Sequence, residues 1–355
     1  MKKIMFYINA IHDGGAERVM VNLAKYFSDN DYDTILVTSF RDKWEYPLAS
    51  KVRRISLEDT EIQQSRIKRN VSRINKLRTL CKVEKPDILV SFMEEPNFRA
   101  ILATIGLPVK TLVSVRNDPN KEYAGKIGLI VGKILLPMAD GCVFQTSDAQ
   151  RWFPAKLQKK SKIIYNAVKE DFYNVERKPI RGEIVTCGRL TEQKNHAMLI
   201  DAFARVKKKY PFVTLKIYGE GDLRKELHKQ ILDLNLDDNV FLMGATNNVE
   251  RVLETADLFV LSSDYEGMPN ALMEAMAVGV PCVSTDCPCG GPRELLGDNS
   301  RNKLVQCGNV NQMVDSICYY FENKEDGTKE KKLSLNFTPE KINRMWEKFV
   351  LEIIG

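Results

Sequence analysis

Short apolar, β-branched runs alternate with segments of helical period along almost the whole chain, the pattern of parallel sheets covered by helices. The strands predicted in the first half are residues 3–9, 33–39, 52–56, 87–91, 110–114, 141–144 and 162–164. Those predicted in the second half are residues 183–187, 213–218, 240–241, 258–261, 281–283 and 303–305. The polar stretch 166–181, with Pro179, is the best linker between the two series. We therefore expect an α/β protein with two doubly wound, Rossmann-like domains facing a central cleft.

The domain boundaries follow from this pattern. We expect an N-terminal domain over residues 1–170, a C-terminal domain over 171–335 and a final helix within 336–355 that packs back towards the N-terminal domain. Thr338, Pro339 and Glu340 give that helix an N-cap, a proline in the first turn and an early acid. The charged stretch 324–332 before it is predicted to be a solvated loop.

Composition narrows the class of protein. The chain has 355 residues, of which 44% are hydrophobic and 28% charged, as in a globular protein of about two domains. Its longest apolar stretch, residues 127–138, contains Lys133 and Pro137 and is shorter than the ~20 residues of a membrane span. The apolar run 4–8 is too short for the core of a signal peptide, so we expect a cytoplasmic protein. Its eight cysteines are expected to be free thiols, and a zinc site is disfavoured because paired C-x-x-C motifs are missing.

Positive charge gathers in the first half of the chain. Residues 1–170 hold 29 Lys and Arg against 19 Asp and Glu, whereas residues 171–355 hold 24 against 28. The densest run, 61–85, has eight basic and two acidic residues around an apolar stripe at helical spacing. This stripe comprises Ile67, Val71, Ile74, Leu77 and Cys81. A solvated helix with one core face explains the run as well as a helix that binds an anionic membrane or a lipid diphosphate does. Nucleic acid is disfavoured because the run lacks aromatic residues.

Three loops carry candidate chemistry. Gly14 and Gly15 follow the first strand and open a helix, where the backbone can approach an anion. Arg189 and Lys194 follow the first strand of the second half, where two cations beside a helix start can neutralise a diphosphate. For the glycines the alternative is a tight turn without a ligand. For Arg189 and Lys194 it is two solvated surface cations.

The third loop has two glutamates. Glu266 lies in the loop after the strand 258–261, and Glu274 lies one turn inside the helix that Pro269 introduces. Carboxylates at such different depths can contact separate parts of one extended ligand. For Glu266 the alternative is an acid that answers the helix dipole, and for Glu274 it is a surface position. The apolar neighbours of Glu274 argue against a surface position.

A D-x-D pattern occurs at Asp29 and Asp31, and again at Asp31 and Asp33, a spacing with which some metal-dependent enzymes hold a divalent cation. It falls between a predicted helix and strand, at the strand end opposite to the expected cleft. We therefore interpret it as a polar turn and expect no metal site.

These motifs resemble a known family. The runs GGAERVMVNLA from Gly14, YNAV from Tyr165, CGRLTEQKNHAMLIDAF from Cys187, IYGEGDLR from Ile217 and EGMPNALMEAMAVGVP from Glu266 resemble the retaining glycosyltransferases of the GT4 family, which have the GT-B fold. The run STDCPCGGPREL from Ser284 is similar to members that build bacterial capsule, O-antigen or lipid-linked oligosaccharides.

The resemblance implies roles for particular residues. Gly14 and Gly15 would lie over the donor diphosphate, and Arg189 and Lys194 would bind it and stabilise the leaving group. Glu266 would contact the hydroxyls of the transferred sugar, and Glu274 would hold the ribose. The N–H groups of the next loop residues would approach sugar and phosphate, namely Gly267, Met268, Pro269, Asn270 and Ala271 (Pro269 itself has no N–H).

One position departs from the family. Many members have a histidine after the strand 110–114, where this chain has Arg116 with Asn117 beside it. Arginine is no base at neutral pH, so we expect Arg116 to orient the sugar or to add positive charge near the phosphate.

The resemblance thus implies a metal-independent retaining hexosyltransferase without a cofactor. It would move a hexose or N-acetylhexosamine from a nucleotide-diphosphate sugar, expected to be UDP-linked, to a polyprenyl-diphosphate-linked surface glycan. It would do so peripherally, on the inner face of the cell membrane. The alternatives are a non-catalytic nucleotide-sugar-binding scaffold and a GT-B phosphorylase or epimerase.

Overall fold

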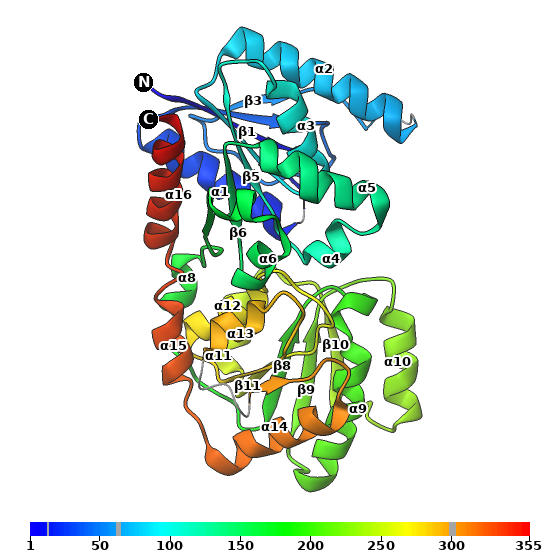
Figure 1. Ribbon diagram of the computed structural model, residues 1–355. Helices are drawn as coiled ribbons and strands as arrows, with labels where there is room; N and C mark the ends of the chain where they lie inside the picture. Colours follow the sequence, from blue (N-terminus) through cyan, green and yellow to red (C-terminus); the bar gives the residue numbers. More distant parts are fainter. Residues whose placement is uncertain (13, 62–64, 298–302) are drawn as a thin grey trace. The chain divides into compact units, whose positions relative to one another are not determined.

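The computed structural model describes all residues except 13, 62–64 and 298–302, and it divides into two compact units (Figure 1). Unit 1 comprises residues 1–166 and 340–355, and unit 2 comprises residues 167–339. The chain therefore leaves unit 1, builds unit 2 and returns for its last helix.

Unit 1 is built on a seven-stranded sheet in the order β3-β2-β1-β4-β5-β6-β7, in which every neighbouring pair is parallel. Its strands are β1 (Lys3–Ile8), β2 (Asp33–Thr38), β3 (Arg53–Ser56), β4 (Ile88–Phe92), β5 (Lys110–Ser114), β6 (Gly141–Phe144) and β7 (Ser161–Ile163). The central strands β1 and β4 read as continuous apolar runs because helices cover both faces of the sheet.

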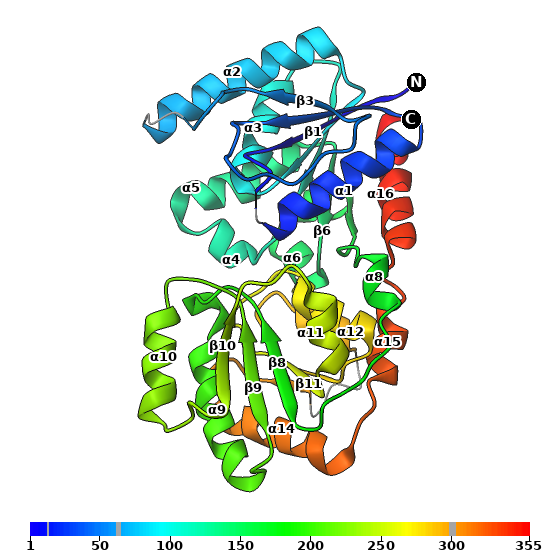
Figure 2. The ribbon, with the colours of Figure 1, turned by 180° about the vertical axis from the view of Figure 1, so that it is seen from behind.

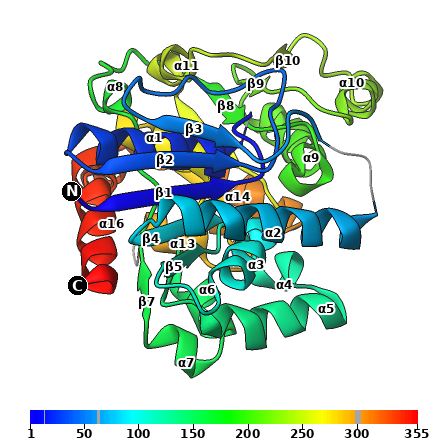
Figure 3. The same ribbon diagram turned by 90° about the horizontal axis from the view of Figure 1, so that it is seen from above.

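The helices of unit 1 form two layers. They are α1 (Gly15–Asp29), α2 (Arg66–Glu84), α3 (Glu94–Thr104), α4 (Pro119–Glu122), α5 (Gly125–Ile130), η1 (Val131–Leu135), η2 (Leu136–Met138), α6 (Ser147–Trp152), α7 (Ala155–Gln158) and α16 (Pro339–Ile354). Helices α2 and α3 pack side by side on one face of the sheet (Figure 3). Helices α1 and α16 lie together (Figure 2), where Tyr26 and Tyr32 both donate to Glu347.

Unit 2 repeats the architecture on a six-stranded parallel sheet, in the order β10-β9-β8-β11-β12-β13. Its strands are β8 (Glu183–Cys187), β9 (Thr214–Tyr218), β10 (Val240–Gly244), β11 (Leu258–Leu261), β12 (Cys282–Thr285) and β13 (Leu304–Val305). Its helices are α8 (Glu170–Tyr173), η3 (Glu192–Lys194), α9 (His196–Lys209), α10 (Arg224–Asp233), α11 (Val249–Thr255), α12 (Asn270–Val278), α13 (Gly291–Leu296), α14 (Val310–Asn323) and α15 (Thr328–Ser334).

Each of the thirteen predicted strands overlaps one observed strand, and the prediction of two doubly wound α/β domains is confirmed. In both units the first strand lies in the middle and the chain winds outwards in both directions. Loops at the carboxyl ends of β1 and β4, and of β8 and β11, therefore flank the point where the winding reverses, which is where such sheets bind ligands.

Residues 324–327 form a loop as predicted, but the prediction of a solvated loop over 324–332 is wrong from Thr328 onwards. Helix α15 covers Thr328–Ser334, and Glu330 in its first turn is buried. Lys303 forms ion pairs with both Glu330 and Glu325, so these two carboxylates are paired inside unit 2.

All eight cysteines are free thiols, as predicted. Six of them are buried, and only Cys289 and Cys307 are partly exposed.

Candidate functional site

The loop that follows β8 is held in one conformation by its own backbone. Gly188 donates its N–H to the Tyr218 carbonyl at 2.9 Å, and Asn195 adopts a left-handed conformation (φ 43°) to cap α9. A Cβ on Gly219 would lie 1.9 Å from the Gly188 carbonyl oxygen, so only glycine allows this close approach. The loop thus brings Lys194 to the carboxyl end of the central strand.

Lys194 and Glu266 form an ion pair across two neighbouring loops of unit 2, and both side chains are largely buried. Ser263 donates its hydroxyl to the same carboxylate oxygen, Oε1, at 2.8 Å. Oε2 of Glu266 accepts no hydrogen bond from the described residues, and the Lys194 ammonium uses one of its three N–H bonds on Glu266. Both groups therefore keep capacity for a ligand.

Further hydrogen bonds join the two loops. Ser262 donates to the Lys194 carbonyl at 2.8 Å, and Asn195 donates to the Asp264 carboxylate at 2.9 Å. Gln193 donates to the Tyr265 carbonyl at 2.9 Å. Lys194 and Glu266 thus sit on a prearranged framework.

The start of α12 lies directly after Glu266. Pro269 occupies the N-cap position and makes no side-chain cap hydrogen bond to the first turn of the helix. Gly267, Met268 and Pro269 are buried, and a Cβ on Gly291 would lie 2.0 Å from the Gly267 carbonyl. Residues 267–269 are therefore packed tightly against the start of α13.

Glu274 is buried on α12. Burial raises the pKa of the Cys187 thiol at the end of β8, and the negative charge of Glu274 raises it further. That charge effect puts the carboxylate near the carboxyl end of β8, and the surface alternative for Glu274 is wrong. Asn270 and Ala271, at the start of the same helix, are partly exposed.

Arg189 differs from Lys194. It is exposed, and its side chain forms no ion pair with any of the described acids. The structure therefore brings Lys194 together with Glu266 and leaves Arg189 at the rim of the same loop.

His196 is a further residue of this loop whose place the sequence did not reveal. Its imidazole is buried next to the backbone of Gly188 and Arg189, and burial lowers its pKa to about 4. Neither ring nitrogen has a well-formed hydrogen bond within the described part of the chain. A neutral ring here supports the turn below Arg189 without adding charge to it.

In unit 1, Gly14 caps α1 with an extended backbone and Gly15 is exposed. A Cβ on Gly14 would lie 1.6 Å from the Glu17 carboxylate, so that carboxylate folds back over the helix start. A diphosphate at this position would have to displace it. Asp13, part of the same motif, lies outside the described residues.

Arg116 is buried after β5 and held on several sides. Its guanidinium lies 4.5 Å above the Phe92 ring, and it donates to Asn166 at 2.6 Å and to Ser114 at 3.4 Å. Burial lowers its pKa to about 9, and the carboxylates of Glu122 and Glu17 counter this effect. Arg116 is thus charged at neutral pH, with its Nε unpartnered in the described chain.

Glu122 is a second buried group that the sequence did not point to. Its Oε1 accepts the Glu94 N–H at 3.0 Å, and its Oε2 is buried without a partner in the part of the chain described. Burial raises its pKa to about 7. Nearby, Asn117 is partly exposed and accepts the Asp118 N–H at 2.9 Å, while Asp118 caps α4.

The basic segment 61–85 contains α2, and half of its eight basic side chains form ion pairs with described acids of unit 1. Four of its basic side chains form ion pairs: Arg66 with Glu95, Arg69 with Glu61, and Arg73 and Lys76 with Glu58. Among the apolar residues at helical spacing in this segment, Leu77 and Cys81 are buried, whereas Ile67 and Val71 are exposed. Part of this segment, 62–64, lies outside the described residues.

The D-x-D residues run from Asp29, the last residue of α1, to Asp33, the first residue of β2, and Asp29 and Asp33 pair with Lys25 and Lys3. Across the described ranges, no group of three or more His, Cys, Asp or Glu side chains is arranged to hold a metal ion. Within the same ranges, none of the helices is both long and apolar enough to span a bilayer.

Comparison with known proteins defines the class. HepE from Anabaena, solved in complex with UDP, superimposes with a TM-score of 0.81 over 99% of this chain and 100% of its own, at 19% identity. The two parallel-sheet units are those of the GT-B glycosyltransferases.

Sequence comparison then gives the family. A model described as glycosyltransferase family 4 matches residues 13–172, and one described as glycosyl transferases group 1 matches residues 169–336. The chain belongs to this family of glycosyltransferases, which confirms the family resemblance seen in the sequence.

Two relatives come from Campylobacter jejuni. One is N-acetylgalactosamine-N,N'-diacetylbacillosaminyl-diphospho-undecaprenol 4-alpha-N-acetylgalactosaminyltransferase, 29% identical over 89% of each chain. The other is GalNAc-alpha-(1->4)-GalNAc-alpha-(1->3)-diNAcBac-PP-undecaprenol alpha-1,4-N-acetyl-D-galactosaminyltransferase, 27% identical over 99% of each chain.

Proposed function

We propose that this chain is a retaining glycosyltransferase that takes a hexose or N-acetylhexosamine from a UDP-linked sugar. Its acceptor would be a polyprenyl-diphosphate-linked glycan. The observation that carries the proposal is the Lys194–Glu266 ion pair, whose glutamate lies in the loop directly before the start of α12. The family membership, the undecaprenol-linked acceptors in the names of both relatives, and UDP in the HepE complex support it.

The chemistry follows from the charges of this loop. Breaking the bond between sugar and phosphate develops negative charge on the diphosphate, which the Lys194 ammonium and the N–H groups at the start of α12 stabilise. Arg189 adds a second cation from the rim. Two fixed sources of positive charge make a bound divalent cation unnecessary, so we propose a metal-independent reaction.

Glu266 binds the transferred sugar, whereas Lys194 stabilises the leaving group. Its Oε2 accepts a hydroxyl of the transferred sugar while Oε1 stays on Lys194 and Ser263. The sugar and the leaving group are thereby held by partners that are themselves bonded, which fixes their relative position. Glu274, deeper on α12, accepts the ribose hydroxyls.

Unit 1 supplies the acceptor side in this proposal. Arg116, which follows β5, keeps its positive charge at neutral pH. The membrane attachment proposed here uses segment 61–85, in which Lys68, Lys82 and Lys85 have no ion-pair partner among the described acids. The protein would thus act on the inner face of the cell membrane.

The test uses purified full-length protein and UDP-sugars. Glu266→Gln and Lys194→Met should each lower the transfer or slow hydrolysis of the donor by at least about a hundredfold while the protein stays folded. Glu192→Gln, an exposed neighbour on η3, is the matched control and should keep the parent rate. Parent activity in both site variants would refute the site, and a strict need for Mg²⁺ or Mn²⁺ would refute metal independence.

The scaffold alternative predicts that UDP raises the melting temperature but that no sugar is released or transferred. Analysis of the products separates the phosphorylase alternative, because a phosphorylase yields free sugar phosphate in place of an extended acceptor.

A further inference from the structure

Unit 1 exposes a row of apolar side chains along α5, η1 and η2, which we name the apolar stripe. Ile127, Ile130, Ile134 and Met138 are 78%, 56%, 65% and 52% exposed. Their spacings of three and four residues place them on one face of the helical segment. This segment thus turns an apolar face to its surroundings, the reverse of an ordinary surface helix.

The inner face of the segment fixes this orientation. Gly128 and Gly132 are buried, and a Cβ on either would meet Tyr123 or Trp152 at under 3 Å. Val131 and Leu136 pack on the same inner side. The stripe cannot turn inwards without breaking these contacts, so its exposure is a property of the fold, and a contiguous exposed apolar patch of this kind marks an interaction surface.

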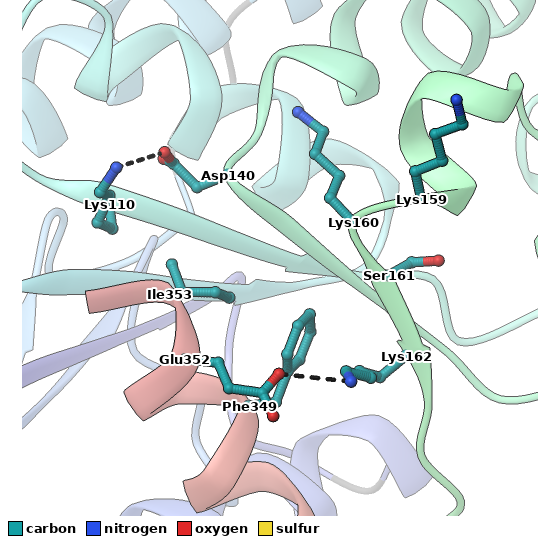
Figure 4. A pocket seen from close by; sticks show the side chains of 9 residues that line it. All are labelled: Lys110, Asp140, Lys159, Lys160, Ser161, Lys162, Phe349, Glu352 and Ile353. Carbon is teal, nitrogen blue, oxygen red and sulfur yellow. Dashed lines mark hydrogen bonds and ion pairs between the residues drawn. The ribbon is translucent and has the colours of Figure 1, made fainter. Parts of the chain in front are cut away.

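The stripe ends at a cluster of lysines, which we name the lysine pocket. Lys110, Lys159, Lys160 and Lys162 line a cavity of about 390 Å³ (Figure 4). Lys110 pairs with Asp140 and Lys162 with Glu352, as the dashed lines show, while no described acid pairs with Lys159 or Lys160. The pocket therefore carries net positive charge.

Two contacts make the stripe and the pocket continuous. Lys160 donates to the Pro137 carbonyl in η2 at 2.8 Å. Met138 lines a neighbouring cavity of about 440 Å³ together with Lys110 and Asp140, which also line the lysine pocket. Apolar and cationic groups thus share one surface.

We infer that the apolar stripe and the lysine pocket dock unit 1 on an anionic phospholipid bilayer. The isoleucines enter the boundary of the acyl chains, and the lysines contact lipid phosphates. Charge favours lipid over a protein partner, because residues 121–162 hold eight Lys and Arg against three Asp and Glu, whereas lysine is depleted at protein interfaces. This inference rests on the membrane setting of the proposed function and adds a second surface to it beside α2.

The test measures binding of the full-length protein to vesicles, without donor or acceptor. Vesicles of phosphatidylcholine alone are compared with vesicles that contain about one third phosphatidylglycerol. The triple variant Ile127→Ser/Ile130→Ser/Ile134→Ser should bind the anionic vesicles about tenfold more weakly. Lys159→Glu should weaken binding to the anionic vesicles only.

The control removes three exposed apolar side chains from unit 2, in the variant Ile180→Ser/Leu232→Ser/Leu335→Ser, and should bind as the parent does. Ile134→Trp provides a direct readout, because its fluorescence should be quenched by brominated acyl chains.

Equal binding of the parent and the stripe variant would overturn the inference, and so would an Ile134→Trp that brominated lipids do not quench. A stripe-dependent dimer without vesicle binding would assign the surface to a second copy of the chain and would also overturn it. The melting-temperature response to UDP is measured in parallel. It reports on the proposed function alone, so the two failures can be told apart.

A second, independent observation concerns two cysteines of unit 2. The last register pair of β12 and β13 is Thr285 with Val305, and Cys287 and Cys307 each follow two residues later. Both thiols approach the Ser263 carbonyl, Cys287 at 3.1 Å and Cys307 at 3.7 Å. Cys287 is buried, and Cys307 lines an open cavity of about 430 Å³.

We propose that Cys307 and Cys287 form a disulfide by exchange with a low-molecular-weight disulfide such as glutathione disulfide. The Cys307 thiolate attacks one sulfur of that disulfide, whose S–S bond breaks to release one thiol. Cys287, once deprotonated, attacks Cys307 Sγ and releases the second. Two protein thiols are oxidised and one external disulfide is reduced.

The pair is coupled to the candidate site through one residue. The Ser263 carbonyl accepts from Cys287, and the Ser263 hydroxyl holds Glu266 Oε1. Disulfide formation removes the first of these hydrogen bonds and so loosens the loop of Glu266. The neighbouring Cys287 thiol lowers the pKa of the Cys307 thiol, in accord with Cys307 as the attacking group.

The test treats the full-length protein with glutathione disulfide and maps its peptides by mass spectrometry. We expect a peptide linked through Cys287 and Cys307, and a glutathione adduct on Cys307 in the Cys287→Ser variant. Cys289→Ser is the control and should still form the link. Adducts without a link in the parent would overturn the proposal, and so would an unchanged UDP-induced rise in melting temperature after the link has formed.

Discussion

Replacing Glu122 by glutamine should flatten the pH dependence of the stability of unit 1. The pKa of this carboxyl is raised by burial from 4.5 to about 7. Between these two values the folded protein still holds a proton that the unfolded chain has released. The free energy of unfolding of the parent therefore falls as the pH rises from 4.5 to 7 and is constant above that.

The size of the effect follows from the shift. A difference of about 2.5 pKa units corresponds to about 3 kcal/mol of stability, lost by the parent across this range and kept by Glu122→Gln. Glutamine retains the oxygen that accepts the Glu94 N–H, so the variant should unfold with a higher free energy than the parent at pH 8.

Urea unfolding followed by tryptophan fluorescence measures this quantity for unit 1, because Trp44, Trp152 and Trp346 all belong to that unit. Glu340→Gln, at an exposed position of the same unit, should leave the pH profile unchanged. Parallel profiles for the parent and Glu122→Gln between pH 5 and 8 would refute the reasoning.

Three further substitutions test the packing. Lys303→Met leaves the buried Glu330 carboxylate unpaired and should lower the free energy of urea unfolding of unit 2 by about 3 kcal/mol. Circular dichroism follows the unfolding, and a change below about 1 kcal/mol would contradict this expectation. Gly327→Ala should lower the same quantity by more than about 1 kcal/mol, since its Cβ would lie 1.8 Å from the Gly279 carbonyl and its φ is +78°; a stable variant would show that the turn adapts. Trp346→Ala should destabilise unit 1 by about 3–5 kcal/mol, measured through the remaining tryptophans, because the ring is fully buried; a loss under about 1 kcal/mol would place α16 outside the core.

Apolar periodicity was enough to find the strands. A parallel strand covered on both faces needs an uninterrupted run such as Ile88–Phe92, and loops cannot imitate such runs. The candidate loops could be found too, because the carboxyl ends of β8 and β11 are where such a fold binds ligands and because the glycines, prolines and charges there follow a family pattern.

Pairing between distant residues could not be predicted. Glu330 reads as solvated until Lys303 is known to face it, and Arg73 reads as a surface cation until Glu58 is seen beside it in the interior. Sequence spacing also could not tell that only half of the stripe on α2 is covered, because the length of the neighbouring helix decides which residues are buried.

The chain passes between the units at two points, near 166 and 339, so unit 2 is an insertion in the sequence of unit 1. Residues 167–339 form one uninterrupted segment, whereas unit 1 needs α16 to cover Phe92 with Trp346. A chimaera that imports a foreign unit 2 must therefore be spliced at both points. A fusion at a single junction would exchange α16 as well, and would leave the imported helix to fit a core for which it was not selected.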